Sequence, residues 1–233
     1  YYDSIQRMNI LNDSCYRGAL IIKNVIECFG NTSSLPHSVP LDLSYVNGIR
    51  EKVLFGGDGL ITKQGIRKPS YYAYSFLQKA GPYYLGKKEN AIIFGNEFLE
   101  YQIICHNCKR LSYHYYLDEM EQHLEKIGQY FDDQDEKELK FRLENVKNGR
   151  YIVKKHSVNM QHGSVQDELR RIAPFESLLM PAFLHNDDVD YLKQILVPQQ
   201  TLRTYEVDNG VLELQITLSA NEIAYLNIQY AYY

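Results

Sequence analysis

The sequence contains few of the features that mark a secreted, membrane-bound or nucleic-acid-binding protein. Four cysteines among 233 residues are too few for a disulfide scaffold and favour a reducing compartment, so we expect a cytoplasmic protein. No run approaches the roughly 18 apolar residues that span a bilayer, so we expect no membrane partner. The 25 basic and 29 acidic residues give a net charge of -4 without a basic block. We therefore expect no direct nucleic-acid contact by this chain.

One short motif, Cys105-His106-Asn107-Cys108, has a spacing that occurs in zinc sites. No second CxxC pair and no spaced pair of histidines accompanies it. In a strand, moreover, residues i and i+3 point to opposite faces, so the two thiols would not converge on one ion. We interpret them as two half-buried thiols that pack as small apolar side chains, and we expect neither a metal nor a cofactor.

The stretch at residues 54–81 organises the rest of the chain, because a glycine turn, a short strand and a helix follow one another there without a gap. Gly56, Gly57 and Gly59 supply the flexible turn. Pro69 stands at the first position of the predicted helix, where its missing N–H would be unpaired anyway, and Gly81 ends it. Apolar residues at helical spacing predict the buried side of this helix: Ala73, Phe76, Leu77 and Ala80.

A second helix is predicted upstream of this stretch. Asn12 or Asp13 can cap it through a side-chain oxygen, and Gly30 ends it. Its apolar stripe recurs at steps of four, three, four and three residues: Cys15, Ala19, Ile22, Ile26 and Phe29. With a predicted strand at 39–46, the order of elements is the one expected at the end of an α/β barrel. Two such units cannot close a barrel, so residues 1–81 need a partner.

From residue 83 the hydrophobic period changes from helical to alternating, which is typical of a β-sandwich. The predicted strands are 91–94, 101–106, 113–117, 139–143, 150–158, 202–207, 211–218 and 223–230. Gly95-Asn96, Lys147-Asn148-Gly149 and Asp208-Asn209-Gly210 have the composition of hairpin turns. The acidic segment 118–138 lacks a clean period, and it is either disordered or a short helix.

Two helices are expected within this β-rich part. Residues 165–172 form the first, and residues 187–196 form the second, with Asp187 or Asp188 as its cap. Pro198 ends the second helix. Its buried stripe is predicted from three apolar residues: Val189, Leu192 and Ile195.

These motifs resemble family 39 glycoside hydrolases, the β-xylosidase family. The glycine pair at 56–57 and the run 68–73 (KPSYYA) match the last loop, strand and helix of the family's barrel, and the run 11–16 (LNDSCY) is similar to the entry of its seventh helix. Further strings are similar to the C-terminal β-sandwich of a subgroup fused to a DNA-binding regulator of the AraC type: 148–151 (NGRY), 157–159 (SVN) and 162–168 (HGSVQDE). The resemblance covers nearly the whole chain.

The resemblance implies a retaining mechanism with one glutamate as acid/base and another as nucleophile. Both would lie upstream of Tyr1, so no catalytic residue is assigned here. It also implies that the loop 45–55 forms one wall of the xyloside site, with Tyr45, Glu51 and Phe55 as the substrate-binding candidates. The family typically has a tryptophan platform where this chain has Val46, and the chain has no tryptophan. Tyr45 is equally compatible with the barrel core, and Glu51 with a solvated loop charge.

We therefore expect an α+β fold. The terminal α/β units of a TIM barrel would occupy residues 1–81, and an antiparallel β-sandwich accessory domain would occupy residues 82–233. Gln166, Asp167 and Glu168 are expected to tie loops of the sandwich to the barrel.

The predicted function is that of the C-terminal portion of a β-xylosidase-like glycoside hydrolase module, inactive by itself. The alternative is a sugar-sensing or dimer-supporting effector module of an AraC-type transcriptional regulator. The expected partners are xylose or a xylo-oligosaccharide in the longer protein and the upstream barrel of the same polypeptide. We also expect a homodimer.

Overall fold

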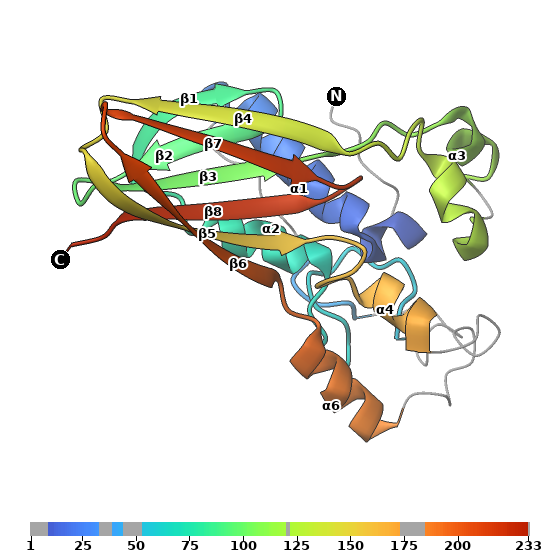
Figure 1. The fold of residues 1–233 in the computed structure, drawn as a ribbon. Coiled ribbons are helices and arrows are strands. Elements are labelled where there is room, and N and C mark those ends of the chain that lie inside the picture. The colour runs from blue at the N-terminus through green and yellow to red at the C-terminus, as the bar shows by residue number, and fades with distance from the viewer. Residues whose placement is uncertain (1–8, 33–38, 44–52, 120–121, 173–184, 233) are drawn as a thin grey trace.

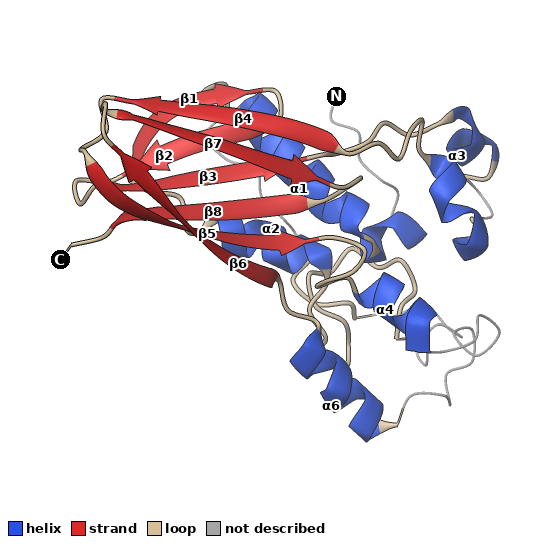
Figure 2. Cartoon of the chain, viewed as in Figure 1, coloured by secondary structure: helices blue, strands red, loops and turns tan. Residues whose placement is uncertain are grey.

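The computed structural model describes residues 9–32, 39–43, 53–119, 122–172 and 185–232. A six-stranded antiparallel sheet lies at its centre, with two strands across one face and two helices on the other (Figure 1). Helices α3 (Tyr113–Leu117), α4 (Val165–Ile172) and α6 (Asn186–Ile195) lie beyond one end of the strands (Figure 2). The predicted α+β class, with an antiparallel sandwich in the second part of the chain, is therefore confirmed.

The described elements have the following bounds in chain order: η1 (Ile10–Asp13), α1 (Cys15–Cys28), α2 (Pro69–Leu77), β1 (Tyr83–Lys88), β2 (Ala91–Gly95), β3 (Glu100–His106), α3 (Tyr113–Leu117), η2 (Leu124–Tyr130), β4 (Lys137–Glu144), β5 (Gly149–Val158), α4 (Val165–Ile172), α6 (Asn186–Ile195), β6 (Gln199–Val207), β7 (Val211–Leu218) and β8 (Ile223–Tyr230). The large sheet has the strand order β1-β2-β3-β8-β5-β6. The small sheet pairs β4 with β7.

The space between the two sheets holds one hydrophobic core. Ile103 of β3, Tyr151 of β5, Leu214 of β7 and Leu226 of β8 are buried there. Because side chains along a strand alternate between faces, the same strands of the large sheet send a second set of side chains to the opposite face. That second set forms another core with the helices.

Helices α1 and α2 cover this opposite face. Ile22 of α1 and Phe76 of α2 are buried against the sheet, and the rings of Phe76 and Tyr225 stack with their centroids 5.8 Å apart. Gly18 lets the helices approach each other, because an added Cβ would lie 3.0 Å from the carbonyl oxygen of Pro69. The helices of the first part of the chain thus share a core with the sheet of the second.

The predicted apolar stripe of α1 is confirmed, but its cap is not. Asn12 and Asp13 lie in η1, and α1 begins after Ser14. The N-cap of η1 is Asn9, whose Oδ1 accepts the N–H of Leu11 at 2.9 Å. Asp13 cannot cap α1, because its carboxylate binds groups from later in the chain, as described below. Helix α2 has its proline at the first position, as predicted.

Two of the three predicted hairpins are wrong. The turns at 145–148 and 208–210 each carry the chain from one sheet to the other, since β5 and β6 belong to the large sheet, and β4 and β7 to the small one. The two turns bind each other: the N–H of Gly210 donates to Asn148 Oδ1 at 2.8 Å, and the N–H of Val146 donates to the carbonyl of Gly210 at 3.0 Å. A positive φ at Gly149 and Gly210 suits a crossing as well as a hairpin, so the local sequence does not separate them.

The segment at 113–117 also differs from the prediction, whereas the acidic segment 118–138 fits one of its two predicted alternatives, a short helix. The expected strand at 113–117 is the short helix α3, and the acidic segment after it contains η2. Tyr115 and Tyr130 are buried with their ring centroids 5.9 Å apart, and the Tyr115 hydroxyl accepts a hydrogen bond from Asn9 Nδ2 at 2.6 Å. The closely spaced tyrosines suggested a strand, but packing against η1 and η2 holds them in a helical turn.

The two helices predicted near residues 165–196 are confirmed as α4 and α6. The cap of α6 is His185 rather than Asp187 or Asp188, and Asp188 instead accepts the His185 N–H at 2.9 Å. Within the described ranges, no helix has the length and apolar character needed to cross a bilayer.

His106 provides a test of the packing at the end of β3. Burial lowers the pKa of His106 to about 4, against 6.5 for the free side chain. The unfolded chain therefore binds a proton that the folded chain excludes. The free energy of unfolding decreases as the pH falls from about 6.5 towards 4, by up to about 3 kcal/mol. Between pH 7 and pH 4.5 the free energy of unfolding, measured with urea, should fall less in His106→Gln than in the unsubstituted chain. His114→Gln, at an exposed position, is the control; equal decreases in all three proteins would contradict the burial of a neutral imidazole.

Candidate functional site

The structure places only one of the three predicted substrate-binding residues. Tyr45 and Glu51 lie outside the described residues. Phe55 is half-buried and immediately precedes the glycine turn. Its ring lies against that turn, since a Cβ added to Gly57 would be 2.8 Å from Phe55 Cε2. The described part of the predicted wall is therefore the end that joins this turn.

A buried lysine lies beneath the glycine turn. The Nζ of Lys68 is 2.6 Å from Asp13 Oδ1, 2.9 Å from Asp42 Oδ2 and 2.7 Å from the carbonyl oxygen of Gly57. The side chain of Lys68 has no solvent exposure, and both aspartates are buried with it. Asp42 and the carbonyl of Gly57 accept hydrogen bonds from the ammonium group, and Asp13 Oδ1 forms an ion pair with it. We call this group of Lys68, Asp13 and Asp42 the lysine centre.

The two carboxylates use their remaining oxygens to hold the turn. Asp13 Oδ2 accepts the N–H of Gly56 at 2.7 Å, and Asp42 Oδ1 accepts the N–H of Gly59 at 2.7 Å. Hydrogen bonds to ionised acceptors are the stronger class. Each aspartate thus connects Lys68 to the backbone of the turn.

The glycines are required by this close packing. A Cβ on Gly56 would lie 2.5 Å from the carbonyl of Asn9, and φ there is +73°. A Cβ on Gly59 would collide with the backbone nitrogen of Asp42. Only a residue without a side chain lets the turn approach these segments.

Local backbone structure directs the members of the centre inward. Lys68 is extended, as expected for a residue before proline, and its N–H donates to the carbonyl of Leu60 at 3.0 Å. Asp42 follows Leu41, which forms an isolated parallel bridge with Ile61, and the Asp42 N–H donates to the carbonyl of Ile61 at 2.9 Å. The centre therefore joins the end of η1, the segment around 42, the glycine turn and the start of α2.

Burial and charge act in opposite directions on these groups. Burial alone would lower the pKa of Lys68, but the carboxylates of Asp13 and Asp42 outweigh it and raise that pKa. Burial raises the pKa of Asp13, and the neighbouring ammonium group offsets only part of this effect. The lysine is thus held in its charged form. Solvent does not reach the Lys68 side chain, and the contacts of the two aspartates position the turn.

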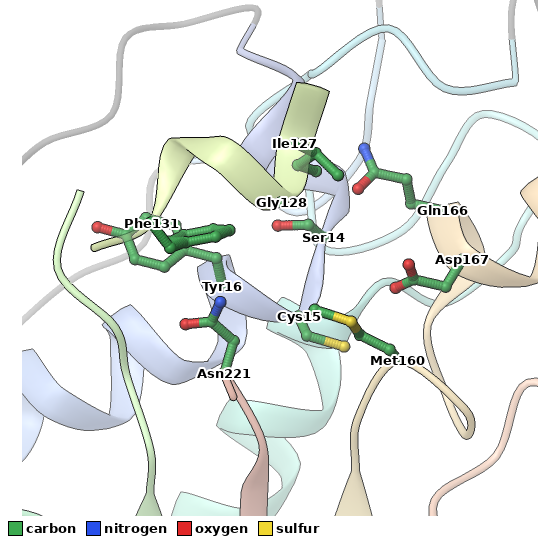
Figure 3. Close-up of a pocket in the computed structure, with 10 residues that line it drawn as sticks. All are labelled: Ser14, Cys15, Tyr16, Ile127, Gly128, Phe131, Met160, Gln166, Asp167 and Asn221. Carbon is green, nitrogen blue, oxygen red and sulfur yellow. The ribbon is translucent and has the colours of Figure 1, made fainter. Parts of the chain in front are cut away.

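A small hollow lies at the start of α1, where Ser14 and Cys15 line it (Figure 3). Its volume is about 20 Å³, enough for about one water molecule and too small for a sugar ring. Cys15 is not a nucleophile there, because burial raises the pKa of its thiol well above the ordinary value. Gln166, which borders the hollow, donates from Nε2 to the carbonyl of Ile10 at 2.9 Å. This bond joins α4 to η1, whereas Asp167 and Glu168 bind Ser164 and Arg171 of their own segment.

The cysteines of the CxxC motif do not form a metal site. Cys105 is fully buried between the two sheets, where burial raises its pKa to about 12, whereas Cys108 is half-buried at a different core. His106 Nδ1 accepts the N–H of Cys108 at 3.0 Å. In the part of the chain that the structure describes, no group of three or more His, Cys, Asp and Glu side chains is placed to hold a metal ion.

The fold is similar to that of several solved structures. The GH39 enzyme from Xanthomonas axonopodis pv. citri matches with a TM-score of 0.76 at 16% identity, over 98% of this chain and 43% of that one. A monomeric β-xylosidase from Caulobacter crescentus CB15 matches with a TM-score of 0.78 at 18% identity, over 98% and 44% of the two chains. The bacterial orthologue of human α-L-iduronidase matches with a TM-score of 0.61 at 9% identity, over 98% and 40%.

This chain has the fold of part of a GH39 enzyme. At these identities the likeness establishes the fold alone, and the chain spans less than half the length of each of the three structures. No protein-family model matches the sequence, and neither does any curated protein. The GH39-like fold includes both the helices of the first part and the sandwich of the second, since 98% of the chain is matched.

Sequence reasoning missed the lysine centre. In the sequence Lys68 belongs only to the run 68–73, and no local motif marks Lys68 or Asp42 for a role. The available signal was the density of glycines at 56–59, which indicates a close backbone approach but not what is approached. The partners are 26 and 55 residues away from Lys68 along the chain, so no local pattern connects them.

Replacement of Lys68 should be strongly destabilising. Lys68→Met leaves two buried carboxylates without their cation, and we expect a loss of about 3–5 kcal/mol in the free energy of unfolding by urea. The exposed Lys63→Met is the matched control and should change stability by less than about 0.5 kcal/mol. Adding Asp13→Asn and Asp42→Asn to Lys68→Met should recover part of the loss. A Lys68→Met protein as stable as Lys63→Met would contradict the proposed role of the centre.

The glycine turn gives an independent test. Gly59→Ala should cost about 1–3 kcal/mol, because its new methyl group meets backbone atoms that cannot move freely. Gly128→Ala is the control, since an added Cβ at that position meets nothing within 4 Å. Thermal unfolding of both variants measures the difference, and equal melting temperatures would count against the close packing of the turn.

Proposed function

We propose that this chain is the C-terminal portion of a β-xylosidase-like glycoside hydrolase module. The catalytic glutamates belong to the upstream part of the longer protein, and this chain supplies the last α/β units of the barrel, within residues 1–81, and the accessory sandwich, within residues 82–233. Its task is structural. It braces the barrel and shapes one edge of the sugar site, and we place the protein in the cytoplasm.

The observation that carries this proposal is the extent of the structural match. Nearly all of this chain superposes on somewhat more than two fifths of a GH39 enzyme and of a β-xylosidase. The upstream barrel of the same polypeptide is therefore the proposed partner of residues 1–81. Xylose or a xylo-oligosaccharide is the proposed ligand of the longer protein.

The lysine centre supports a role for the loop 45–55 in the sugar site. Barrel enzymes build their sites from loops at the carboxyl ends of the strands, and such loops need a rigid base. Phe55 enters a turn whose backbone is fixed by Asp13 and Asp42. Tyr45, Glu51 and Phe55 are the proposed substrate-binding residues.

A second candidate is the sugar-sensing or dimer-supporting module of an AraC-type transcriptional regulator. The observation that favours it is the absence of tryptophan, with Val46 at the position of the family's sugar platform. A site without the platform has diverged from the catalytic members of the family. Such a site suits a sensor, which binds a sugar without cleaving it. A helix-turn-helix pair preceding the barrel would distinguish this candidate from an enzyme.

The catalytic prediction is tested with an aryl β-xyloside. The 233-residue chain alone should release no detectable aryl alcohol, because both carboxylates of the reaction lie outside it. Release of the alcohol by a preparation free of other glycosidases would contradict the proposal.

The ligand prediction is tested by titrating the longer protein with xylobiose while following its melting temperature. Glu51→Gln should weaken the apparent affinity on the order of tenfold, because a charged acceptor of sugar hydroxyls is lost. Glu144→Gln, at an exposed position of β4, is the control and should leave the titration unchanged. An unchanged titration for both Glu51→Gln and Phe55→Ala would remove the loop from the site.

A further inference from the structure

The two edge strands of the large sheet are unequally protected. Strand β1 carries an irregularity in its pairing between Tyr84 and Gly86 and ends in two lysines. The Nζ of Lys87 donates to the carbonyls of Ile26 and Phe29, at 3.0 and 2.7 Å. Bulges and lysines are the usual means by which a protein prevents an edge strand from pairing with another chain.

Strand β6, at the opposite edge, has neither a bulge nor a lysine. Its nine residues pair with β5 in a continuous register from Gln199 to Val207, without a bulge and without proline. It carries one basic and one acidic residue, Arg203 and Glu206. Threonine, leucine and tyrosine give it a high preference for extended structure.

The outer side of β6 is open. In an antiparallel pair, alternate residues direct their backbone N–H and C=O groups away from the partner strand. Among the described residues, the backbone of β6 bonds only to β5. A groove of about 500 Å³ lies between β6 and the small sheet, lined in part by Arg203 and Tyr205 of β6 and by Leu214 of β7. Figure 1 shows β6 at the lower margin of the sheet, with no strand beyond it.

Leu202 adds an apolar contact at the middle of this edge. Its exposure is 58%, and the neighbouring residues of β6 are almost all exposed as well. An edge that is long, regular and carries an exposed leucine is a template for another strand.

We propose that β6 pairs with β6 of a second copy of this chain, antiparallel, so that the two large sheets continue into each other across a twofold axis. The partner is a second copy because the strand is compatible with itself: Arg203 and Glu206 cancel in charge, so two copies do not repel each other. This inference does not depend on the proposed sugar function.

The symmetry restricts the register. A twofold axis perpendicular to the sheet keeps each face on the same side, so directly opposed residues must be an even number of positions apart in the sequence. A register centred on Arg203 would oppose two like charges, which is destabilising. A register centred on Leu202 buries the exposed leucine against its copy and opposes Arg203 with Thr201 and Tyr205 with Gln199. We therefore assign the register centred on Leu202.

The interface is a small one. Seven opposed residue pairs at an edge, 199–205 of each copy, fall at the low end of the size range of specific interfaces, where association is weak. The dimer should therefore be sought at chain concentrations from about 10 µM to 1 mM.

The test compares two matched substitutions of exposed leucines on the two edge strands. Leu202→Lys places a charge at the centre of the proposed pair, whereas Leu85→Lys does the same on β1, where Leu85 is 52% exposed. Sedimentation equilibrium should show a dimer for the unsubstituted chain and for Leu85→Lys, and at least tenfold weaker association for Leu202→Lys. Thermal unfolding checks that both variants fold.

Cysteine cross-linking tests the register directly. Under mild oxidation Leu202→Cys should form a disulfide-linked dimer, and Leu85→Cys should not. A monomeric unsubstituted chain at 1 mM, taken as the top of the range above, would overturn the proposal. So would a dimer that survives Leu202→Lys, or one that Leu85→Lys disrupts equally. Binding of a synthetic peptide with the β6 sequence to a chain that stays monomeric would assign the edge to an extended peptide instead.

Discussion

The buried ammonium group of Lys68 is the interaction on which the arrangement of the first part of the chain depends. A charge without access to water is tolerated only when opposite charges and hydrogen bonds surround it, and Asp13, Asp42 and the carbonyl of Gly57 meet that requirement. The carboxylates in turn bind the backbone of the glycine turn. One cation therefore fixes four segments that secondary structure alone would leave unconnected. The Lys68 cation therefore serves to hold the glycine turn in one conformation.

The second constraint is the sharing of the large sheet between two cores. One face packs against β4 and β7, and the other against α1 and α2. The alternation of side chains in β3 and β8 makes this possible, because neighbours such as Ile103 and Ile104 belong to different cores. The helices that resemble the end of a barrel are thus packed on the sandwich itself. Helix α2 is thus held twice, by its N-cap Lys68 in the lysine centre and by Phe76 against the sheet.

Periodic elements could be predicted from the sequence, whereas their connections could not. The apolar stripe through Ala19 and Ile22 and the proline at position 69 gave α1 and α2, and alternation gave most of the strands. The composition of the glycine turns before β5 and β7 predicts hairpins, but the choice of partner strand depends on residues far away in the sequence. Tyr115 suggested a strand by composition, yet contacts with Asn9 and Tyr130 decided its conformation. The lysine centre was missed for the same reason, since its members are distant in the chain.

For function, the consequence is a rigid base for a loop of which only one end, at Phe55, lies among the described residues. The central claim is that the glycine turn is as firmly held as the sheet. Native-state hydrogen exchange tests it most directly, through the amides of Gly56 and Gly59, which donate to the two carboxylates. The account predicts that these amides exchange as slowly as that of Leu226 in the middle of β8. Exchange as fast as that of Asn209, in the exposed turn before β7, would contradict it.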